Sequence, residues 1–207
     1  MTRKLLIAPS TASRAAARTR PALKPLSLAL LSVALSAQAA QPLPSTVLPS
    51  GMQVINGQAS LSTQGTQLTV RNSANSILNW QSFSIGRDAS VYFDQASSSS
   101  KVLNRVLGND PSQILGRLAS NGQVWLLNPN GVLFGRDARV DVASLVTSTL
   151  RLNDSDFLAG RYRFSAQAGD GGLVRNEGVL KSSLGGQVVL LGSRIENVGS
   201  VEAERGQ

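Results

Sequence analysis

The chain has 207 residues, with 20 basic and 12 acidic side chains, and it contains neither cysteine nor histidine. Without cysteine the chain has no disulfide, so the fold must be held by its core or by repetition. Without histidine it lacks the Ser-His-Asp and Cys-His catalytic arrangements and the usual zinc ligand sets.

The first 39 residues have the order of a secretory signal peptide. Six basic side chains and no acidic one come first: Arg3, Lys4, Arg14, Arg18, Arg20 and Lys24. An apolar run from Leu26 to Leu35 follows, and then Ala37-Gln38-Ala39 gives a small-x-small cleavage pattern. A run of about ten residues is too short to cross a bilayer as a helix, which argues against a membrane anchor. We expect a signal peptide at 1–39, outside the fold, and one domain at 40–207.

Removing the signal peptide changes the charge argument. Of the 20 basic side chains, the six in the signal peptide are lost, which leaves 14 against 12 acidic ones. The remaining arginines are spread singly along the chain, whereas nucleic-acid binding needs a concentrated positive field. We therefore exclude a nucleic-acid partner.

An extended leader and short strands follow. Pro42, Pro44 and Pro49 favour an extended backbone between Gln41 and Gly51. Beyond it, glycine and small polar residues separate short segments typical of strands. We place these strands at Gln53–Asn56, Ala59–Ser62, Gln67–Arg71, Ser76–Trp80 and Ser90–Phe93.

Only two segments favour a helical turn. Asp110 fits the N-cap position before Pro111–Leu115, with proline at the first helical place. Asp154 fits the same position for a single turn through Leu158. No other window has a sustained helical period, so we expect an all-β fold.

A sharp corner is predicted at Asn128-Pro129-Asn130-Gly131. An Asx residue, proline, asparagine and glycine suit the four successive positions of a type I turn. The flanking apolar runs Val124–Leu127 and Val132–Phe134 have the length of buried strands. The unit is therefore strand, turn, strand.

Repeats near 20 residues indicate a parallel β-helix, with a two-sheet sandwich as the alternative. Near the end of the chain Val174, Asn176 and Gly178 recur 21 residues later as Ile195, Asn197 and Gly199, and Gly186-Gln187 recurs as Gly206-Gln207. A second echo, Gly86–Val91 and Gly135–Val140, is 49 residues apart, or about two coils. The matched asparagines predict a ladder of side-chain amides. Because the repeat is unfinished at Gln207, we expect a fragment or a truncated exoprotein.

The corner also carries a resemblance to a known family. The stretch from Asn121 to Gly135, NGQVWLLNPNGVLFG, resembles the core of the secretion domain of two-partner-secreted exoproteins, the N-terminal domain of filamentous haemagglutinins and related adhesins. The segments Ile77–Phe83, Leu103–Val106 and Pro111–Gly116 support the match, which covers about residues 50 to 165. The family's Asn-Pro-Asn-Leu tetrapeptide is missing. Ala96 and Ser97–Ser100 stand there instead, which is closer to the adhesin branch.

The resemblance implies a fold, a function and a partner. The fold is a right-handed parallel β-helix, a pectin-lyase-like solenoid with small extra β elements. The function is secretion targeting: an outer-membrane β-barrel transporter with periplasmic domains recognises the chain, partly by pairing with its edge strands, and the domain then nucleates β-helix folding outside the cell. The chain is expected at the cell surface or secreted, through the periplasm and outer membrane. The candidate partner-binding positions are Asn128, Pro129, Asn130, Gly131, Asn104, Arg105, Asn79 and Trp80.

Two other functions are weighed against this one. The first is a carbohydrate-binding adhesin module with host glycans or receptors as partners, for which aromatic residues would form a stacking platform; their place in apolar runs favours core packing instead. These residues are Trp80, Trp125, Phe83, Phe93 and Phe134.

The second alternative function is a β-helical lyase or hydrolase, which needs clustered acids. Asp137, Asp141, Asp154 and Asp156 are scattered beside arginines, among them Arg151 near Asp154, so we expect no enzyme, metal or cofactor.

Overall fold

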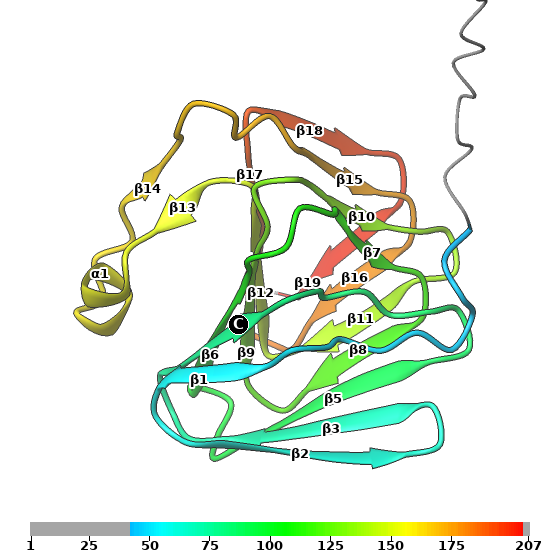
Figure 1. Cartoon of the computed structure of the whole chain (residues 1–207), viewed down its shortest axis with the longest axis horizontal. Helices are drawn as coiled ribbons and strands as arrows, with labels where there is room; N and C mark the ends of the chain where they lie inside the picture. The colour runs from blue at the N-terminus through cyan, green and yellow to red at the C-terminus, as the bar shows by residue number, and fades with distance from the viewer. Residues whose placement is uncertain (1–41, 205–207) are drawn as a thin grey trace, which may run out of the picture. The chain divides into compact units, whose positions relative to one another are not determined.

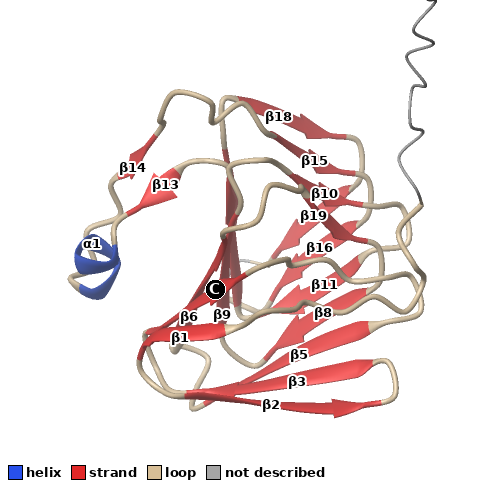
Figure 2. Ribbon diagram, viewed as in Figure 1, coloured by secondary structure: helices blue, strands red, loops and turns tan. Residues whose placement is uncertain are grey.

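The computed structural model describes residues 42–204, which form a parallel β-solenoid of about six turns (Figures 1 and 2). The β-helix predicted from the repeats and the resemblance is therefore confirmed. The expected signal peptide and the recurrence at Gly206-Gln207 lie outside the described residues.

Three sheets form the sides of the solenoid. Sheet I contains, in order, β1 (Gln53–Asn56), β4 (Ser76–Trp80), β6 (Lys101–Val106), β9 (Gln123–Leu127), β12 (Ser144–Ser148) and β17 (Val188–Leu191). Sheet II contains β2 (Ala59–Gln64), β3 (Gln67–Asn72), β5 (Ser90–Gln95), β8 (Arg117–Ser120), β11 (Arg139–Val142), β16 (Val179–Ser182) and β19 (Ser200–Ala203). Sheet III contains β7 (Ser112–Ile114), β10 (Val132–Phe134), β15 (Leu173–Asn176) and β18 (Arg194–Asn197).

Each coil visits the sheets in the order II, I, III, so that strands of successive coils pair in parallel; β8, β9 and β10 are one example. The register stacks apolar side chains into rows that run the length of the core. One row of buried side chains in sheet II consists of Leu68, Val91, Leu118, Val140 and Leu180. Because Val91 and Val140 stand two coils apart in this row, the echo 49 residues apart is confirmed.

The 21-residue repeat has the predicted asparagine ladder. β15 and β18 pair in register, with Asn176 opposite Asn197. Nδ2 of Asn176 donates to Oδ1 of Asn197 at 2.8 Å, and Oδ1 of Asn176 accepts from the backbone N–H of Gly178 at 3.0 Å. The side chain thereby satisfies backbone groups at the corner where glycine turns the chain.

The predicted strands are confirmed, with longer ends at Gln64, Asn72 and Gln95. The helical turn predicted at Pro111–Leu115 is wrong. This segment is β7, because Ser112–Ile114 pairs in parallel with β10, and the stacking of coils overrides the local capping signal.

The helical turn at Asp154 is confirmed as α1 (Asp154–Leu158), with one correction: the N-cap is Asn153, which makes no side-chain cap hydrogen bond. This helix belongs to an excursion, residues 149–172, that leaves the solenoid between β12 and β15 (Figure 1). The excursion also contains a two-stranded antiparallel sheet, β13 (Arg151–Leu152) and β14 (Phe164–Ser165).

A second apolar cluster lies on the outer face of sheet I, beneath the excursion. Outward-facing residues of four successive strands form one row, Ile77, Leu103, Trp125 and Val146. Leu152, Phe157 and Phe164 of the excursion pack on this row. The Trp125 ring lies 5.5 Å from that of Phe157 and is stacked at 6.1 Å on that of Phe164, centroid to centroid. Burial of these side chains therefore holds the excursion against the solenoid.

The aromatic residues weighed as a carbohydrate platform are all buried. Trp80, Phe83, Phe93 and Phe134 belong to the core inside the solenoid, and Trp125 belongs to the outer cluster. Trp80 and Phe83 meet edge to face at 5.4 Å between ring centroids. Core packing is thus confirmed for all five residues, and none of them offers a free ring for a sugar to stack on.

Candidate functional site at the Asn128–Gly131 corner

The sharp turn predicted between the strands around Pro129 is confirmed. The backbone N–H of Gly131 donates to the carbonyl of Asn128 at 3.0 Å, and that of Asn130 donates to Oδ1 of Asn128, also at 3.0 Å. Gly131 has φ of +124°, a conformation that glycine adopts without steric cost.

Both asparagine side chains of the corner bind the preceding coil. Asn128 is fully buried, and its Nδ2 donates to the carbonyl of Asp110 and to Oγ of Ser112, each at 3.0 Å. Nδ2 of Asn130 donates to the carbonyl of Gly108 at 2.8 Å. The corner thus fixes the loop that leads into β7.

The corner also binds the coil that follows. The backbone N–H of Gly172 donates to the carbonyl of Pro129 at 3.1 Å. A Cβ on Gly172 would lie 2.4 Å from the nitrogen of Gly131 and 2.5 Å from the Pro129 oxygen, too close for any other residue without a backbone shift. Three coils therefore meet at this corner.

Trp80 and Asn104 face the interior of the solenoid, and both are fully buried. The indole N–H of Trp80 donates to Oδ1 of Asn104 at 2.9 Å, and Nδ2 of Asn104 donates to the carbonyl of Trp125 at 3.2 Å. A buried indole N–H needs such a partner. Asn104 therefore joins three coils from within.

Arg105, the next residue, points outward to the excursion. One terminal nitrogen of its guanidinium donates to the carbonyl of Leu152 at 2.8 Å and to Oδ1 of Asp154 at 2.6 Å. The other approaches Oδ1 of Asn79 at 3.4 Å. Arg105 thereby links two neighbouring strands of sheet I to the start of α1.

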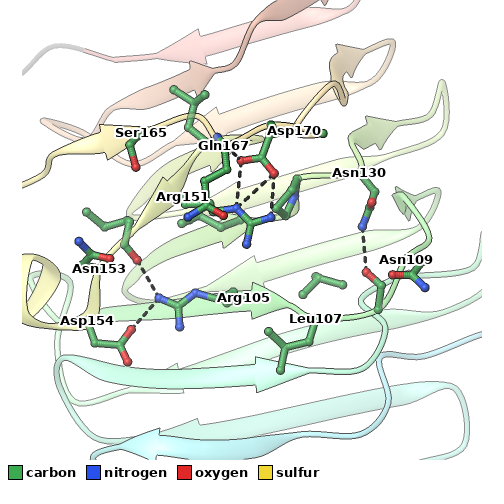
Figure 3. A pocket seen from close by; sticks show the side chains of 18 of the residues that line it. Arg105, Leu107, Asn109, Asn130, Arg151, Asn153, Asp154, Ser165, Gln167 and Asp170 are labelled. Atoms are coloured by element: carbon green, nitrogen blue, oxygen red, sulfur yellow. Dashed lines mark hydrogen bonds and ion pairs between the residues drawn. The ribbon is translucent and has the colours of Figure 1, made fainter.

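An open cleft of about 800 Å³ lies between sheet I, the corner and the excursion (Figure 3). Three of the predicted partner-binding residues line it: Arg105, Pro129 and Asn130. The other five do not line the cleft, and they are Asn79, Trp80, Asn104, Asn128 and Gly131. The predicted residues thus gather on one side of the solenoid, some at the surface of the cleft and the rest behind it.

The opposite wall of the cleft depends on an ion pair that the sequence did not predict. Arg151 forms a bidentate pair with Asp170, with nitrogen–oxygen distances of 2.8 to 3.2 Å. The guanidinium and the backbone N–H of Gln167 lower the pKa of the Asp170 carboxyl, and the same carboxylate raises the pKa of Arg151. Asp154, the acidic residue near Arg151 in the sequence, binds Arg105 instead.

The other carboxylates weighed for catalysis do not converge. Asp137 pairs with Arg87 and Asp156 with Arg161, whereas Asp141 lies on β11. Among residues 42–204, no three acidic side chains gather in a way that could hold a metal ion. No helix in this part of the chain is long and apolar enough to cross a bilayer.

The fold and this site define a class of protein, a β-solenoid with an asparagine-rich corner and a docked excursion. Within that class, a family model described as the TPS secretion domain matches residues 45–206, and the chain belongs to this family. The two-partner secretion domain expected from the resemblance is therefore confirmed.

Individual relatives agree with this assignment. A heme/hemopexin-binding protein of Haemophilus influenzae strain Rd is 35% identical over 163 residues, 75% of this chain but 18% of that protein. A second Haemophilus influenzae protein of that name is 34% identical over 109 residues, 52% of this chain and 12% of that protein. The crystal structure of the HMW1 secretion domain from Haemophilus influenzae superposes with a TM-score of 0.70 at 34% identity, over 74% of this chain and 41% of that one.

Membership in the TPS secretion domain family bears on two expectations from the sequence, enzyme activity and location. The family consists of secretion domains and is not an enzyme family. Its members are secreted through the outer membrane, so the expected secreted or cell-surface location is confirmed. The chain spans less than a fifth of the length of the curated relatives it matches.

Proposed function

We propose that this domain targets a haemagglutinin- or adhesin-like exoprotein to an outer-membrane β-barrel transporter, whose periplasmic domains bind it without any catalytic step. The observation that carries the proposal is the gathering of Asn79, Arg105 and Asn130, from three successive coils, on one side of the solenoid. A single partner surface can therefore contact the cleft and the corner together. A transporter suits this site better than a host glycan or receptor, because the five aromatic residues weighed as a stacking platform are buried.

The last coil supports a further part of the proposal, nucleation of folding. Within the described residues, the outer edges of β17, β18 and β19 have no partner strand. Ile195, Val198 and Val201 are exposed on this coil. Any residues that follow would cover these side chains by stacking another coil in the same register.

We also propose that residues 1–39 are removed during export and that the mature domain begins at Ala40. The order of basic segment, apolar run and small-x-small pattern supports this proposal. Mass spectrometry of the secreted protein should give an N-terminus at Ala40. Secreted material that begins upstream of Lys24 would contradict it.

Alanine in place of Asn128, Pro129 and Asn130 together tests the role of the corner. The variant loses the side-chain bonds to the preceding coil, and we expect its free energy of unfolding to fall by a few kcal/mol, about 2–4. Two quantities are measured for the same variant: the thermal stability of the refolded domain, and the amount exported when the transporter is co-expressed. If the corner serves recognition, export falls further than the stability loss explains.

A core variant of similar stability provides the control. Val140→Ala removes a buried side chain of sheet II and should cost about 1–3 kcal/mol while leaving the corner unchanged. Export of the triple variant well below that of Val140→Ala at equal stability supports recognition by the transporter. Equal export of the two would show that the corner acts only by holding the coils together.

A further inference from the structure

Within residues 42–204, only one of the six outer edges of sheets I, II and III is covered, that of β7. On sheet III, β7 pairs with β10 on one side and is bridged on the other by Ile85, and residues 45–47 cover the same side of the first coil. The edges of β17, β18 and β19 face the end of the domain where a further coil would stack. At the opposite end of the described residues, the free edges are those of β1 and β2 (Figure 1).

These two edges differ in their suitability for pairing. β1 has four residues, and its register with β4 is interrupted by a bulge between Val54 and Asn56. β2 is six residues long and pairs with β3 at every position without a bulge. It contains no proline and no charged side chain, so it lacks the devices by which proteins protect an edge strand from further pairing.

In the β2–β3 hairpin, the positions of the hydrogen-bonded pairs determine which backbone groups of β2 are free. The backbone N–H of Ser73 donates to the carbonyl of Gln58. Since hydrogen-bonded and non-bonded pairs alternate along an antiparallel ladder, Ser60 and Ser62 also bond to β3. The N–H and C=O groups of Leu61 and Thr63 therefore point to the open edge.

Exposed apolar residues lie on and near this edge. Leu61 lies in the same row as Val70 and Phe93, which are buried, yet Leu61 itself is 45% exposed. Val54 and Ile55, at the same end of the solenoid, are 40% and 46% exposed. An added strand with alternating apolar and polar residues would place an apolar side chain over Leu61 and extend the core by one strand.

We infer that β2 is the strand to which a periplasmic domain of the transporter adds one of its own strands. The inference rests on the proposed function and gives the transporter a second contact, an edge strand of sheet II, in addition to the cleft and the corner. Pairing at β2 leaves β17, β18 and β19 free, so the transporter can hold the domain while further coils stack at the other end. The partner strand must be extended and must carry apolar residues at alternate positions.

Backbone amide exchange of the secreted chain, measured by NMR with and without the periplasmic domain of its transporter, tests this directly. The amides of Leu61 and Thr63 should exchange fast in the free chain and at least tenfold more slowly in the complex. The amides of Ser60 and Ser62 are the internal control, because they are bonded to β3 in both states. Binding without added protection at Leu61 and Thr63 would overturn the assignment to β2 while leaving the proposed function intact.

A pair of variants provides a second readout. Thr63→Pro removes one outward N–H at a position where an edge strand tolerates proline, and the Kd for the periplasmic domain should rise about tenfold. Thr63→Val keeps the N–H and should bind like the wild type. Equal binding by both variants would contradict the inference.

Sedimentation of the wild type alone completes the test: self-association lost in Thr63→Pro would make a second copy the partner at this edge. No binding and no export of the wild-type chain would reject the proposed function itself.

Discussion

Trp125→Ala should release the excursion from the solenoid without unfolding the coils. Truncating a buried tryptophan costs about 3–5 kcal/mol. On the outer face of sheet I, Phe157 and Phe164 pack on the ring of Trp125. Of the ion pairs that remain, Arg105 with Asp154 is partly exposed and contributes about 0–1 kcal/mol. Arg151 and Asp170 both belong to the excursion, so their pair does not hold it to the solenoid. Amide exchange should therefore accelerate between Arg151 and Asp170, whereas the amides of Thr149 and Gly172, which are bonded to Leu191 and Pro129, should stay protected.

The other tryptophan of the chain is the control for this prediction. Trp80→Ala removes a side chain of the same size from the interior, where it contacts Phe83. Its loss should lower the stability of the whole solenoid, so that amides of β5 and β8 exchange faster as well. If Trp125→Ala instead accelerates exchange equally in β5, β8 and the excursion, then the excursion and the solenoid form one cooperative unit.

The elements that the sequence predicts correctly are those with a local cause. Pro129 and Gly131 specify their turn by backbone preference, and the strands are bounded by glycine and small polar residues. The asparagine ladder follows from the 21-residue spacing of Asn176 and Asn197, because a solenoid coil of that length places equivalent residues side by side. These features require no knowledge of distant contacts.

The docking of the excursion could not be derived in this way. Ile77, Leu103 and Trp125 are separated by more than 20 residues each and become one apolar row only when the register is known. A signal was nevertheless present in the sequence. Trp125 is followed by Leu126 and Leu127, and such uninterrupted apolar runs are typical of a strand that is buried on both faces.

Only some of the residues that line the cleft could be predicted from the sequence. Arg105, Pro129 and Asn130 were singled out by the resemblance, whereas the wall formed by Arg151 and Asp170 was missed. Asp170 is 19 residues from its partner, in a glycine-rich segment without secondary structure. No periodicity in such a segment indicates which way a side chain points. Sequence neighbours such as Arg151 and Asp154 are a poor guide to pairing because each belongs to a different local element.

Asn104→Ala should destabilise the domain more than the removal of its neighbour Arg105. The alanine variant leaves the indole N–H of Trp80 without its partner inside the core and removes the side-chain hydrogen bond to the carbonyl of Trp125. An unsatisfied buried group costs about 1–3 kcal/mol and a lost hydrogen bond about 0.5–1.5 kcal/mol, so we expect a loss of about 2–4 kcal/mol in urea unfolding followed by tryptophan fluorescence.

Arg105→Ala is the matched control, because this side chain points to the excursion and is partly exposed. Its loss should change the global free energy of unfolding by about 1 kcal/mol or less and loosen the excursion only. A stability loss for Asn104→Ala that is no larger than that of Arg105→Ala would contradict the role of Asn104 inside the core.

The same two variants distinguish which state of the chain the transporter recognises. Asn104 is fully buried in the folded domain and cannot touch a partner there, whereas Arg105 lines the cleft. If recognition follows folding, export of Asn104→Ala should fall only as far as its stability does, and Arg105→Ala should reduce export with stability almost unchanged. The opposite result is that Asn104→Ala lowers export by more than its loss of stability explains, while Arg105→Ala is exported normally. In that case the transporter recognises this segment before the coils fold.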